Sequence, residues 1–454
     1  MTDAPSPEPV GAAEFAARRR ALFERMCDGS VAILRTADQV ERTFDTCYRF
    51  RPRSHFYHVT GFIEPEAWAV FVRRSASDCE YLLFTRRPVP EREAWLGKRS
   101  GPTEAVEVFG ADRGYLVEQL DDIGPPLLDG INTVYYLFGR DDVVHARLPQ
   151  WLRSVQYKVR RGVVAPTNLS QLETLVSELR LYKSAAEIAL LQHAVDITVD
   201  GLLHVMSATR PGMHEYELEA ELTREYLRRG AEPSFAPTVI SGVDGCLSHY
   251  RERNAGPVRD GDLVLIDTGA EYEFYTSDLT VTYPANGRFS GRQRALYELV
   301  LSIERELMSL VSPGVTLDVP QGIVPDRVIS GLLDLGVISG SYDEHLEKET
   351  WRRFFMHNMG HWLGLDIHDE ATYAIDENRW RQLLPNMVMT LEPGIYVRSG
   401  TPDVNPDWWN IGARIEDNIL VTEDGVTVMS EKIPRLPADI EAFMREARGK
   451  APDA

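Results

Sequence analysis

Hydrophobic and polar positions follow two different patterns along the chain, and the change falls near residue 184. Before it, apolar runs of strand length alternate with helical patterns, which is typical of an α/β layer. The strand-like runs are "SVAILRT", "AWAVFVRR", "EYLLFT" and "NTVYYLFG". Helices are predicted over 12–26, 112–121 and 142–156.

The second part of the chain opens with a capping box. Ser184 and Glu187 begin the long apolar-periodic helix "AAEIALLQHAVDITVDGLLHVM", and a second helix, "EYELEAELTREYLRR", ends at Gly230. Further helices are predicted near 290–311 and 324–335, and strands at "APTVIS", "DLVLIDTG", "YTSDLTVTYP", 361–368, "NMVMTLEPGIYV" and "GARIEDNILVTEDG". Long helices mixed with antiparallel-looking strands predict an α+β domain rather than repeated βαβ units.

The chain length favours two domains, because 454 residues exceed what one ordinary core supports. The three prolines and few apolar residues of 1–10 predict a disordered tail. A smaller α/β domain is then expected over 11–175, followed by the α+β domain over 176–454.

Charge and cysteine content narrow the class of protein. The formal net charge of −20 argues against a nucleic-acid partner and against docking on anionic membrane. We see no apolar run near the ~20 residues that span a bilayer, and no signal-peptide pattern at the N-terminus. The four cysteines have no CxxC-like spacing, which is typical of reduced thiols. The cytoplasm is the expected compartment.

Two aspartates occupy positions where strand pairing disfavours them. If the hairpin of 260–287 turns between Tyr272 and Glu273, Asp267 lies opposite Asp278. Directly opposed like charges destabilise a sheet, whereas a cation between them would convert the repulsion into binding. The alternative is that the register differs and that the Asp-x-Gly sequence simply forms a turn.

Two glutamates repeat this anomaly downstream. Glu392 interrupts the apolar run "MVMTLEPGIYV", and Glu416 lies in "IGARIEDNILV". A lone Glu on a strand is usually its solvent face, but buried carboxylates need pairing or a metal. "FFMHNMGHWLGLDIHD" adds candidate imidazole ligands. Four carboxylates and one nitrogen suit Mn²⁺, with Co²⁺, Fe²⁺ or Zn²⁺ as alternatives, and bridging carboxylates imply two ions.

Five motifs in chain order resemble the pita-bread metallopeptidase family (peptidase family M24). They are "DTG" (267–269), "SDLT" (277–280), "GHWLG" (360–364), "LEPGIY" (391–396) and "RIEDN" (414–418). The stretches 47–67 and 92–101 resemble the front domain of its aminopeptidase P (Xaa-Pro aminopeptidase) subfamily. The resemblance implies a C-terminal pita-bread (creatinase/aminopeptidase) fold behind a smaller N-terminal α/β domain.

The resemblance also implies the site residues and the reaction. It makes Asp278 and Glu416 ligands of both ions, Asp267 a ligand of one, and His361 and Glu392 ligands of the other. A hydroxide between the metals would attack the carbonyl before a proline in second position. Glu392 would carry a proton to the leaving nitrogen.

Three further residues match positions that line this family's active site. His249 and His368 would hydrogen-bond the substrate and the developing oxyanion, and His357 would lie beside the pocket for the residue after the scissile bond. Arg414 would orient a ligand carboxylate. For each histidine the alternative is an imidazole with an ordinary structural role. Phe235 and Val281 depart from the pattern, where relatives often carry a tyrosine and an arginine.

The ligands do not separate an aminopeptidase from a prolidase, which cleaves only Xaa-Pro dipeptides. A metal-free interaction protein of the same fold is a third alternative, disfavoured by the intact ligand set. A creatinase-like C–N hydrolase is a fourth, and it would not keep these carboxylates. Relatives form dimers or tetramers, so we expect a homo-oligomer, with Trp95 as a candidate contact.

Overall fold

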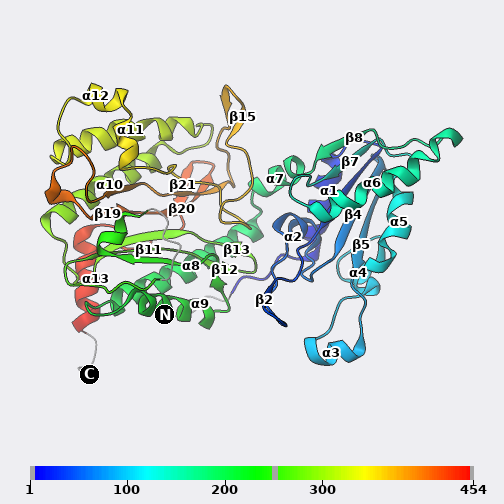
Figure 1. Ribbon diagram of the computed structural model, residues 1–454, viewed down its shortest axis with the longest axis horizontal. Helices are drawn as coiled ribbons and strands as arrows, with labels where there is room; N and C mark the ends of the chain where they lie inside the picture. The colour runs from blue at the N-terminus through cyan, green and yellow to red at the C-terminus, as the bar shows by residue number, and fades with distance from the viewer. Residues whose placement is uncertain (1–5, 248–253, 450–454) are drawn as a thin grey trace. The chain divides into compact units, whose positions relative to one another are not determined.

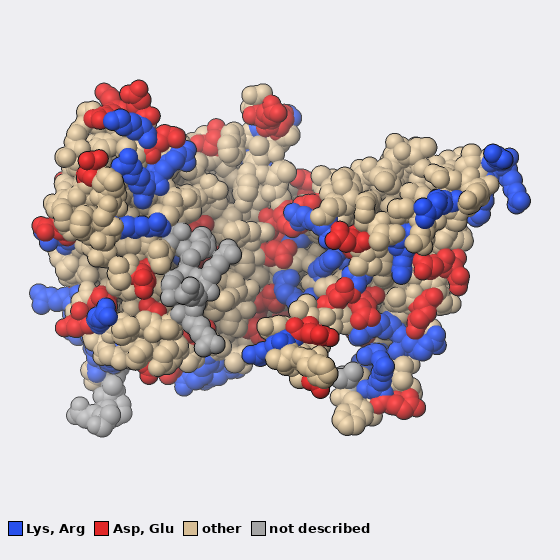
Figure 2. Space-filling view, viewed as in Figure 1, with Lys and Arg blue, Asp and Glu red and all other residues tan. Residues whose placement is uncertain are grey.

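Two units make up the chain in the computed structural model, which describes residues 6–247 and 254–449 (Figure 1). One unit comprises Glu8–Arg180, and the chain enters the other at Leu181. On the face drawn in Figure 2, acidic and basic side chains alternate in small groups over both units.

A six-stranded mixed sheet, in the order β6-β5-β4-β1-β7-β8, forms the centre of the N-terminal unit. Its strands are β1 (Ser30–Arg35), β4 (Trp68–Ser75), β5 (Asp78–Thr85), β6 (Arg113–Leu116), β7 (Thr133–Tyr136) and β8 (Asn168–Gln171), and a short hairpin of β2 (Glu41–Thr43) and β3 (Thr46–Cys47) lies outside it. The helices are α1 (Ala12–Arg25), α2 (Ser54–Thr60), α3 (Pro90–Leu96), α4 (Pro102–Glu107), α5 (Leu120–Leu127), α6 (Asp142–Gln156) and α7 (Glu173–Leu181).

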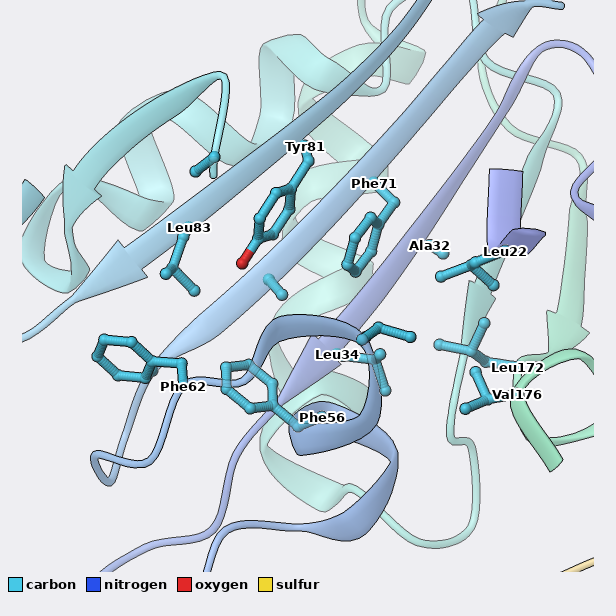
Figure 3. Close-up of a cluster of buried hydrophobic side chains, with 14 of the residues drawn as sticks. Leu22, Ala32, Leu34, Phe56, Phe62, Phe71, Tyr81, Leu83, Leu172 and Val176 are labelled. Atoms are coloured by element: carbon cyan, nitrogen blue, oxygen red, sulfur yellow. The ribbon is translucent and has the colours of Figure 1, made fainter. Parts of the chain in front are cut away.

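Both faces of this sheet are buried, because successive strand residues enter different hydrophobic clusters. In β1, Ala32 and Leu34 join one cluster, while Val31 and Ile33 join the other. Figure 3 shows the first cluster, in which Phe56, Phe62, Phe71 and Tyr81 lie close together. The rings of Phe71 and Tyr81 stack with centroids 4.9 Å apart.

The helix predicted over 112–121 is wrong. Edge strand β6 occupies its first part, followed by a 3₁₀ turn at Val117–Gln119, and α5 begins at Leu120. The strand exists because Leu82 to Thr85 of β5 pair with it in parallel. That partner is distant in sequence, so a local pattern could not reveal it.

Helices cover small sheets in the C-terminal unit (Figure 1). α8 packs on β12, β13 and β14, whereas α10 packs on β17, β18 and β19. The helices are α8 (Ala185–Ala208), α9 (Glu215–Arg228), α10 (Gly291–Leu310), α11 (Asp318–Asp334), α12 (Tyr342–Glu347) and α13 (Pro437–Gly449). The strands are β9 (Glu232–Pro233), β10 (Thr238–Ser241), β11 (Leu263–Thr268), β12 (Ala270–Tyr272), β13 (Tyr275–Thr276), β14 (Leu279–Pro284), β15 (Ala374–Asp376), β16 (Arg379–Trp380), β17 (Val388–Leu391), β18 (Gly394–Val397), β19 (Ile411–Arg414), β20 (Asp417–Thr422) and β21 (Gly425–Val428).

The long helix α8 starts at the predicted capping box. The hydroxyl of Ser184 accepts from the amide of Glu187, whose carboxylate accepts from the amide of Ser184. By length and composition alone α8 could cross a membrane, which the sequence analysis did not anticipate. More than half of its most apolar window, 56%, is buried inside the protein. One such helix is weak support for a membrane span, because buried core helices have the same composition.

The ligand-bearing hairpin has a different register from the predicted one. Asp267 lies opposite Thr280, not Asp278. The turn is centred one residue later than predicted, at Glu273 and Phe274, which both take positive φ. Such a two-residue turn is usually built from Asn and Gly, so the sequence did not mark it. Because side chains alternate with a period of two, a register shift of two residues leaves each side chain on the same face of the sheet.

The strand predicted over 361–368 is also wrong. This stretch is a loop that makes one bridge to β17, between Trp362 and Met389. The loop is nevertheless fixed, because the amide of Asp369 donates to the carbonyl of Trp362 at 2.9 Å. Buried apolar residues such as Leu363 and Leu365 gave it the composition of a strand.

Candidate metal centre

Three of the four carboxylates singled out in the sequence lie where a strand is interrupted. Asp278 immediately precedes β14, Glu392 separates β17 from β18, and Glu416 separates β19 from β20. Asp267 is the next-to-last residue of β11. A strand break releases the side chain from strict alternation, so carboxylates from different sheets can turn toward one point.

Asp278, His361 and Glu416 come together as a group that could hold a metal ion. One ligand atom from each lies within 4.8 Å of the others, and all three residues are buried. Nε2 of His361 is 3.5 Å from Oδ2 of Asp278 and 3.8 Å from Oε1 of Glu392. The structure therefore brings Glu392 to the same cluster.

The hydrogen bonds of His361 fix which ring nitrogen faces the carboxylates. Its Nδ1 lies 3.1 Å from the carbonyl of Trp362 and must donate there, because a carbonyl oxygen only accepts. In the neutral ring, Nε2 then presents a lone pair to Asp278 and Glu392. A lone pair facing carboxylates is the arrangement of a metal-ligating histidine whose other nitrogen is held by a backbone carbonyl.

Burial and mutual repulsion dominate the electrostatics of this cluster. Burial, followed by the charges of Asp267 and Glu392, raises the pKa of Asp278 well above its ordinary value. Burial and the charge of Asp278 do the same to the pKa of Glu416. Burial raises the pKa of Glu392 to about 7. Protons or a cation must neutralise such a group.

The donor set fits a divalent ion. Oδ1 of Asp278 is buried and has no hydrogen-bond partner among the described residues. Most buried polar atoms in proteins are paired, so an unpaired carboxylate oxygen inside a group of carboxylates is a position for a cation. Oxygen ligands with one imidazole nitrogen suit Mn²⁺ and similar ions.

Arg414 links the cluster to two residues that the sequence analysis did not assign a role. Its Nη2 donates to Asp267 at 2.5 Å, its Nη1 to the hydroxyl of Tyr396 at 2.7 Å and its Nε to Thr280 at 3.1 Å. The Thr280 hydroxyl in turn donates to Oε2 of Glu416 at 2.8 Å. Thr280 and Tyr396 belong to the quoted motifs "SDLT" and "LEPGIY", so their motif positions were the available signal.

The remaining predicted residues surround this cluster at different depths. His357 donates from Nδ1 to the carbonyl of Asn358, and its Nε2 lies 3.1 Å from the Tyr396 hydroxyl. Its Nδ1 is also 3.6 Å from Glu392. His368 is an exposed residue, and the centroid of its ring lies 4.1 Å from that of the His361 ring. His249 lies outside the described residues.

Two motif glycines are required by close backbone approach. A Cβ at Gly269 would lie 1.6 Å from the carbonyl oxygen of Ser277, and a Cβ at Gly360 would lie 2.0 Å from that of Thr390. Any side chain at these positions would push the Asp267 strand from Asp278, or His361 from β17. These contacts explain the glycine of "DTG" and the first glycine of "GHWLG".

Val281, one of the two departures from the family pattern, points away from the carboxylates. It is buried and pairs with Ile266, whereas the neighbouring pair Asp267 and Thr280 occupies the other face of the hairpin. An apolar residue here therefore leaves the cluster intact. Phe235 is half-buried in the segment between β9 and β10.

Comparison with known proteins places the chain among metallopeptidases. Residues 189–423 match metallopeptidase family M24, and residues 15–135 match the aminopeptidase P N-terminal domain. The Xaa-Pro aminopeptidase of Escherichia coli (strain K12) is 39% identical over 436 residues, which are 96% of this chain and 98% of that protein. Human Xaa-Pro aminopeptidase 3 is 32% identical over 89% of this chain and 78% of its own. The structure of Pseudomonas aeruginosa aminopeptidase PepP has a TM-score of 0.93 and 39% identity, covering 97% of this chain and 100% of that one. The chain therefore belongs to metallopeptidase family M24.

Proposed function

We propose that the protein is a metal-dependent Xaa-Pro aminopeptidase, which releases the N-terminal residue from peptides with proline in second position. The observation that carries the proposal is the buried cluster of Asp278, His361 and Glu416. This cluster lies in a chain that is 39% identical, over 96% of its length, to an Xaa-Pro aminopeptidase. Structures of E. coli aminopeptidase P with substrate and with product have a TM-score of 0.93 and 38% identity.

The centre is proposed to hold two divalent ions, with Mn²⁺ as the first candidate and Co²⁺, Fe²⁺ or Zn²⁺ as alternatives. The proposed ligands are Asp267, Asp278, His361, Glu392 and Glu416, with Asp278 and Glu416 shared between the ions. The oxygen-rich donor set supports a hard ion. Bound there, the ions would polarise the scissile carbonyl and generate the nucleophile from water at neutral pH.

Glu392 is proposed to move the proton that the leaving group needs. The nitrogen of proline is a tertiary amide in the substrate and must be protonated to leave. In the metal-free protein burial raises the pKa of Glu392 to about 7, and bound cations would lower it again. The carboxylate would then accept a proton from the attacking water and pass it to the leaving nitrogen, as a general acid–base group does.

Three histidines and one arginine are proposed to act around the ligands. His368, exposed beside the ring of His361, is in position to hydrogen-bond substrate, and His249 is assigned the same role from its motif. His357 is proposed to line the pocket after the scissile bond. Arg414 is proposed to orient Asp267, to which it donates at 2.5 Å.

Substrate length separates the aminopeptidase from a prolidase of the same chemistry. The test compares cleavage of Arg-Pro-Pro and Ala-Pro by the metal-loaded protein. An aminopeptidase releases arginine from the tripeptide. Turnover confined to the dipeptide would replace this proposal with a prolidase.

Metal analysis separates an enzyme from a metal-free interaction protein. Purified protein should hold close to two ions per chain after incubation with Mn²⁺, and dialysis against a chelator should abolish cleavage. A metal content far below two, together with no cleavage, would favour the interaction protein.

Glu392→Ala should abolish turnover while the chain stays folded, because it removes both a ligand and the proposed proton carrier. Circular dichroism and cleavage of Arg-Pro-Pro measure the two effects. Glu423→Ala, at an exposed position in the turn after β20, is the control and should keep full activity. Wild-type turnover by Glu392→Ala would refute the assigned role.

The protein is further proposed to act in the cytoplasm as a homo-oligomer. Its four cysteines are free thiols, which supports a reducing compartment. Light scattering after gel filtration tests the oligomer, and a monomeric mass at micromolar concentration would contradict it.

A further inference from the structure

The two chain segments that carry Asp278 and Glu416 are joined by an unusual antiparallel pairing. At its centre Thr280 and Glu416 form a backbone bridge, with the Glu416 amide donating to the Thr280 carbonyl at 3.1 Å. Two positions to either side, side chains take the place of backbone partners. The pairing therefore has a backbone contact only in the middle of the described stretch.

Both flanking contacts use the same register as the central bridge. On one side, the Asn418 carboxamide accepts from the amide of Asp278 at 3.1 Å and donates to its carbonyl at 2.5 Å. On the other, the Thr282 hydroxyl donates to the carbonyl of Arg414 at 2.9 Å and accepts from its amide at 3.2 Å. Side chains that reach across replace ladder bonds where strands diverge, so the backbones alone do not set the spacing here.

Arg435 bridges the same two segments from outside the pairing. It lies in the chain between β21 and α13. Its Nη1 donates to the carbonyl of Thr280 at 3.0 Å and its Nη2 to that of Glu416 at 2.7 Å. One rigid guanidinium thus holds one carbonyl on each segment, a geometry that a lysine ammonium does not reproduce.

The guanidinium is itself held in place by a buried carboxylate. Asp417, which follows Glu416 in the chain, accepts from Nη2 of Arg435 and from the Ser430 hydroxyl. The Asp417 side chain is 4% exposed and that of Arg435 12%. This ion pair fixes the guanidinium in the one orientation that reaches both carbonyls.

We propose that Arg435 is a positioning residue for the metal centre, which sets the separation of the Asp278 and Glu416 carboxylates by clamping the backbones of Thr280 and Glu416. The inference rests on the proposed metal centre. Arg435 touches neither substrate nor metal in this assignment, and it acts through the two segments it joins. Residues that orient metal ligands typically change metal affinity by about 10–100-fold when replaced.

The test is a Mn²⁺ titration of the metal-free full-length protein, with free Mn²⁺ followed by electron paramagnetic resonance. Arg435→Met should weaken Mn²⁺ binding by about 10–100-fold. Arg435→Lys keeps the positive charge beside Asp417 but loses the two guanidinium nitrogens that reach both carbonyls. We therefore expect an intermediate loss of Mn²⁺ affinity. Thermal unfolding of the metal-free variants is measured alongside.

Arg448→Met is the matched control. Arg448 lies in α13 of the same unit and likewise donates to backbone carbonyls, those of Asn286, Ala285 and Thr209. It contacts none of the proposed ligands in the bonds described. This variant should lower the unfolding temperature and leave Mn²⁺ affinity within about twofold of wild type.

Unchanged Mn²⁺ affinity of Arg435→Met, or an equal loss in Arg448→Met, would overturn the proposal, because the effect would then be absent or general. If Arg435→Met does not fold, Arg435→Lys decides in the same titration, and wild-type affinity again overturns it. If the wild type itself takes up no Mn²⁺, the proposed metal centre fails and the role of Arg435 with it. Binding by the wild type with unchanged variants refutes the clamp alone.

Discussion

The core of the N-terminal sheet and the candidate metal centre of the C-terminal unit are both buried, but they are filled with opposite kinds of side chain. Around Phe71 the cluster is apolar (Figure 3). The β1–β4 ladder that contains Phe71 runs without a break from Ser30↔Arg73 to Arg35↔Trp68. Around Asp278 the side chains are carboxylates, and the strands are interrupted where those side chains emerge.

The two regions also differ in the surroundings of a buried polar atom that has no hydrogen-bond partner. The Tyr81 hydroxyl is buried in the apolar cluster with no hydrogen-bond partner among the described residues. The ring of the same residue stacks on Phe71, and this contact offsets the cost of the unpaired hydroxyl. Oδ1 of Asp278 also has no partner among the described residues. Three other carboxylates lie beside it, and their negative charges repel one another. An isolated unpartnered atom is a small local cost, whereas an unpartnered oxygen inside a cluster of buried carboxylates marks a binding site.

This comparison leads us to expect that residues of the first region stabilise the fold and that residues of the second cost stability and supply function. Substitutions in each region, and a change of pH, test that division.

Asp278→Asn should lower kcat/KM for Arg-Pro-Pro by about 10³-fold or more, because a lost metal ligand removes several kcal/mol of transition-state stabilisation. The same change should raise the unfolding temperature of the metal-free protein, since it removes the free-energy cost of burying and neutralising one carboxyl of the cluster. Asp424→Asn, at an exposed turn position, should change neither quantity. A variant that loses activity and also loses stability without metal would break the proposed division.

Phe71→Ala should lower the free energy of unfolding by about 3–5 kcal/mol, because it leaves a cavity in the N-terminal core. Chemical denaturation monitored by fluorescence measures the change. Mn²⁺ affinity should stay at the wild-type value for the fraction that is folded. Phe44→Ala is the control, since this phenylalanine is 94% exposed and should cost nothing measurable.

The metal-free protein should become less stable as pH rises from about 4.5 to 8. Burial raises the pKa of Glu392 to about 7 from an ordinary value of 4.5, so the folded state holds its proton where the unfolded chain has lost it. The stabilisation is complete below the unfolded pKa and disappears as pH passes the folded one, about 3 kcal/mol for this shift. Burial also raises the pKa values of Asp278 and Glu416, with the same sign.

Chemical denaturation in chelator at several pH values measures this dependence, and Glu392→Gln isolates the contribution of one carboxyl. The difference between wild type and Glu392→Gln should shrink on the acidic side and grow toward pH 8. Parallel curves for the two proteins would show that folding does not raise the pKa of Glu392.

Tyr81→Phe should leave the free energy of unfolding unchanged or raise it by up to about 1 kcal/mol, because the hydroxyl it removes is buried without a partner. Tyr283→Phe is the matched control, since its hydroxyl lies 2.9 Å from that of Thr209 inside the C-terminal unit. That variant should lose about 1–2 kcal/mol. Equal losses in both variants would mean that the Tyr81 hydroxyl has a partner.

Local signals in the sequence predicted the long helices well, and the α+β fold prediction is confirmed. The capping box of Ser184 and Glu187 marks the start of α8, and the helix expected over 290–311 is found at Gly291–Leu310. Both rest on contacts between residues a few positions apart. The errors at 112–121 and 361–368 come from segments whose conformation depends on distant partners.

In the candidate site, too, contacts between residues distant in sequence could not be predicted. Motif spacing pointed to the carboxylates, and the structure brings Asp278, His361 and Glu416 together. The sequence could not say which carboxylate Arg414 contacts, and the answer is Asp267, 147 positions earlier. Asn418 belongs to the motif "RIEDN", but the sequence revealed neither its role nor that of Arg435. An amide or a guanidinium acquires a role here only through the backbone that lies opposite it.

The side-chain contacts of Thr282 and Asn418 have a consequence for transplanting this centre. In an ordinary ladder the hydrogen bonds come from the backbone, which is the same for nearly every residue. A slip in register then exchanges partners without losing hydrogen bonds. Here the hydrogen bonds on either side of Glu416 are made by particular side chains. A slip in register would therefore separate Thr282 from Arg414 and Asn418 from Asp278 together. Register in this pairing is therefore encoded in residue identity. A protein engineered to receive the two carboxylates would need these two positions as well as the ligands.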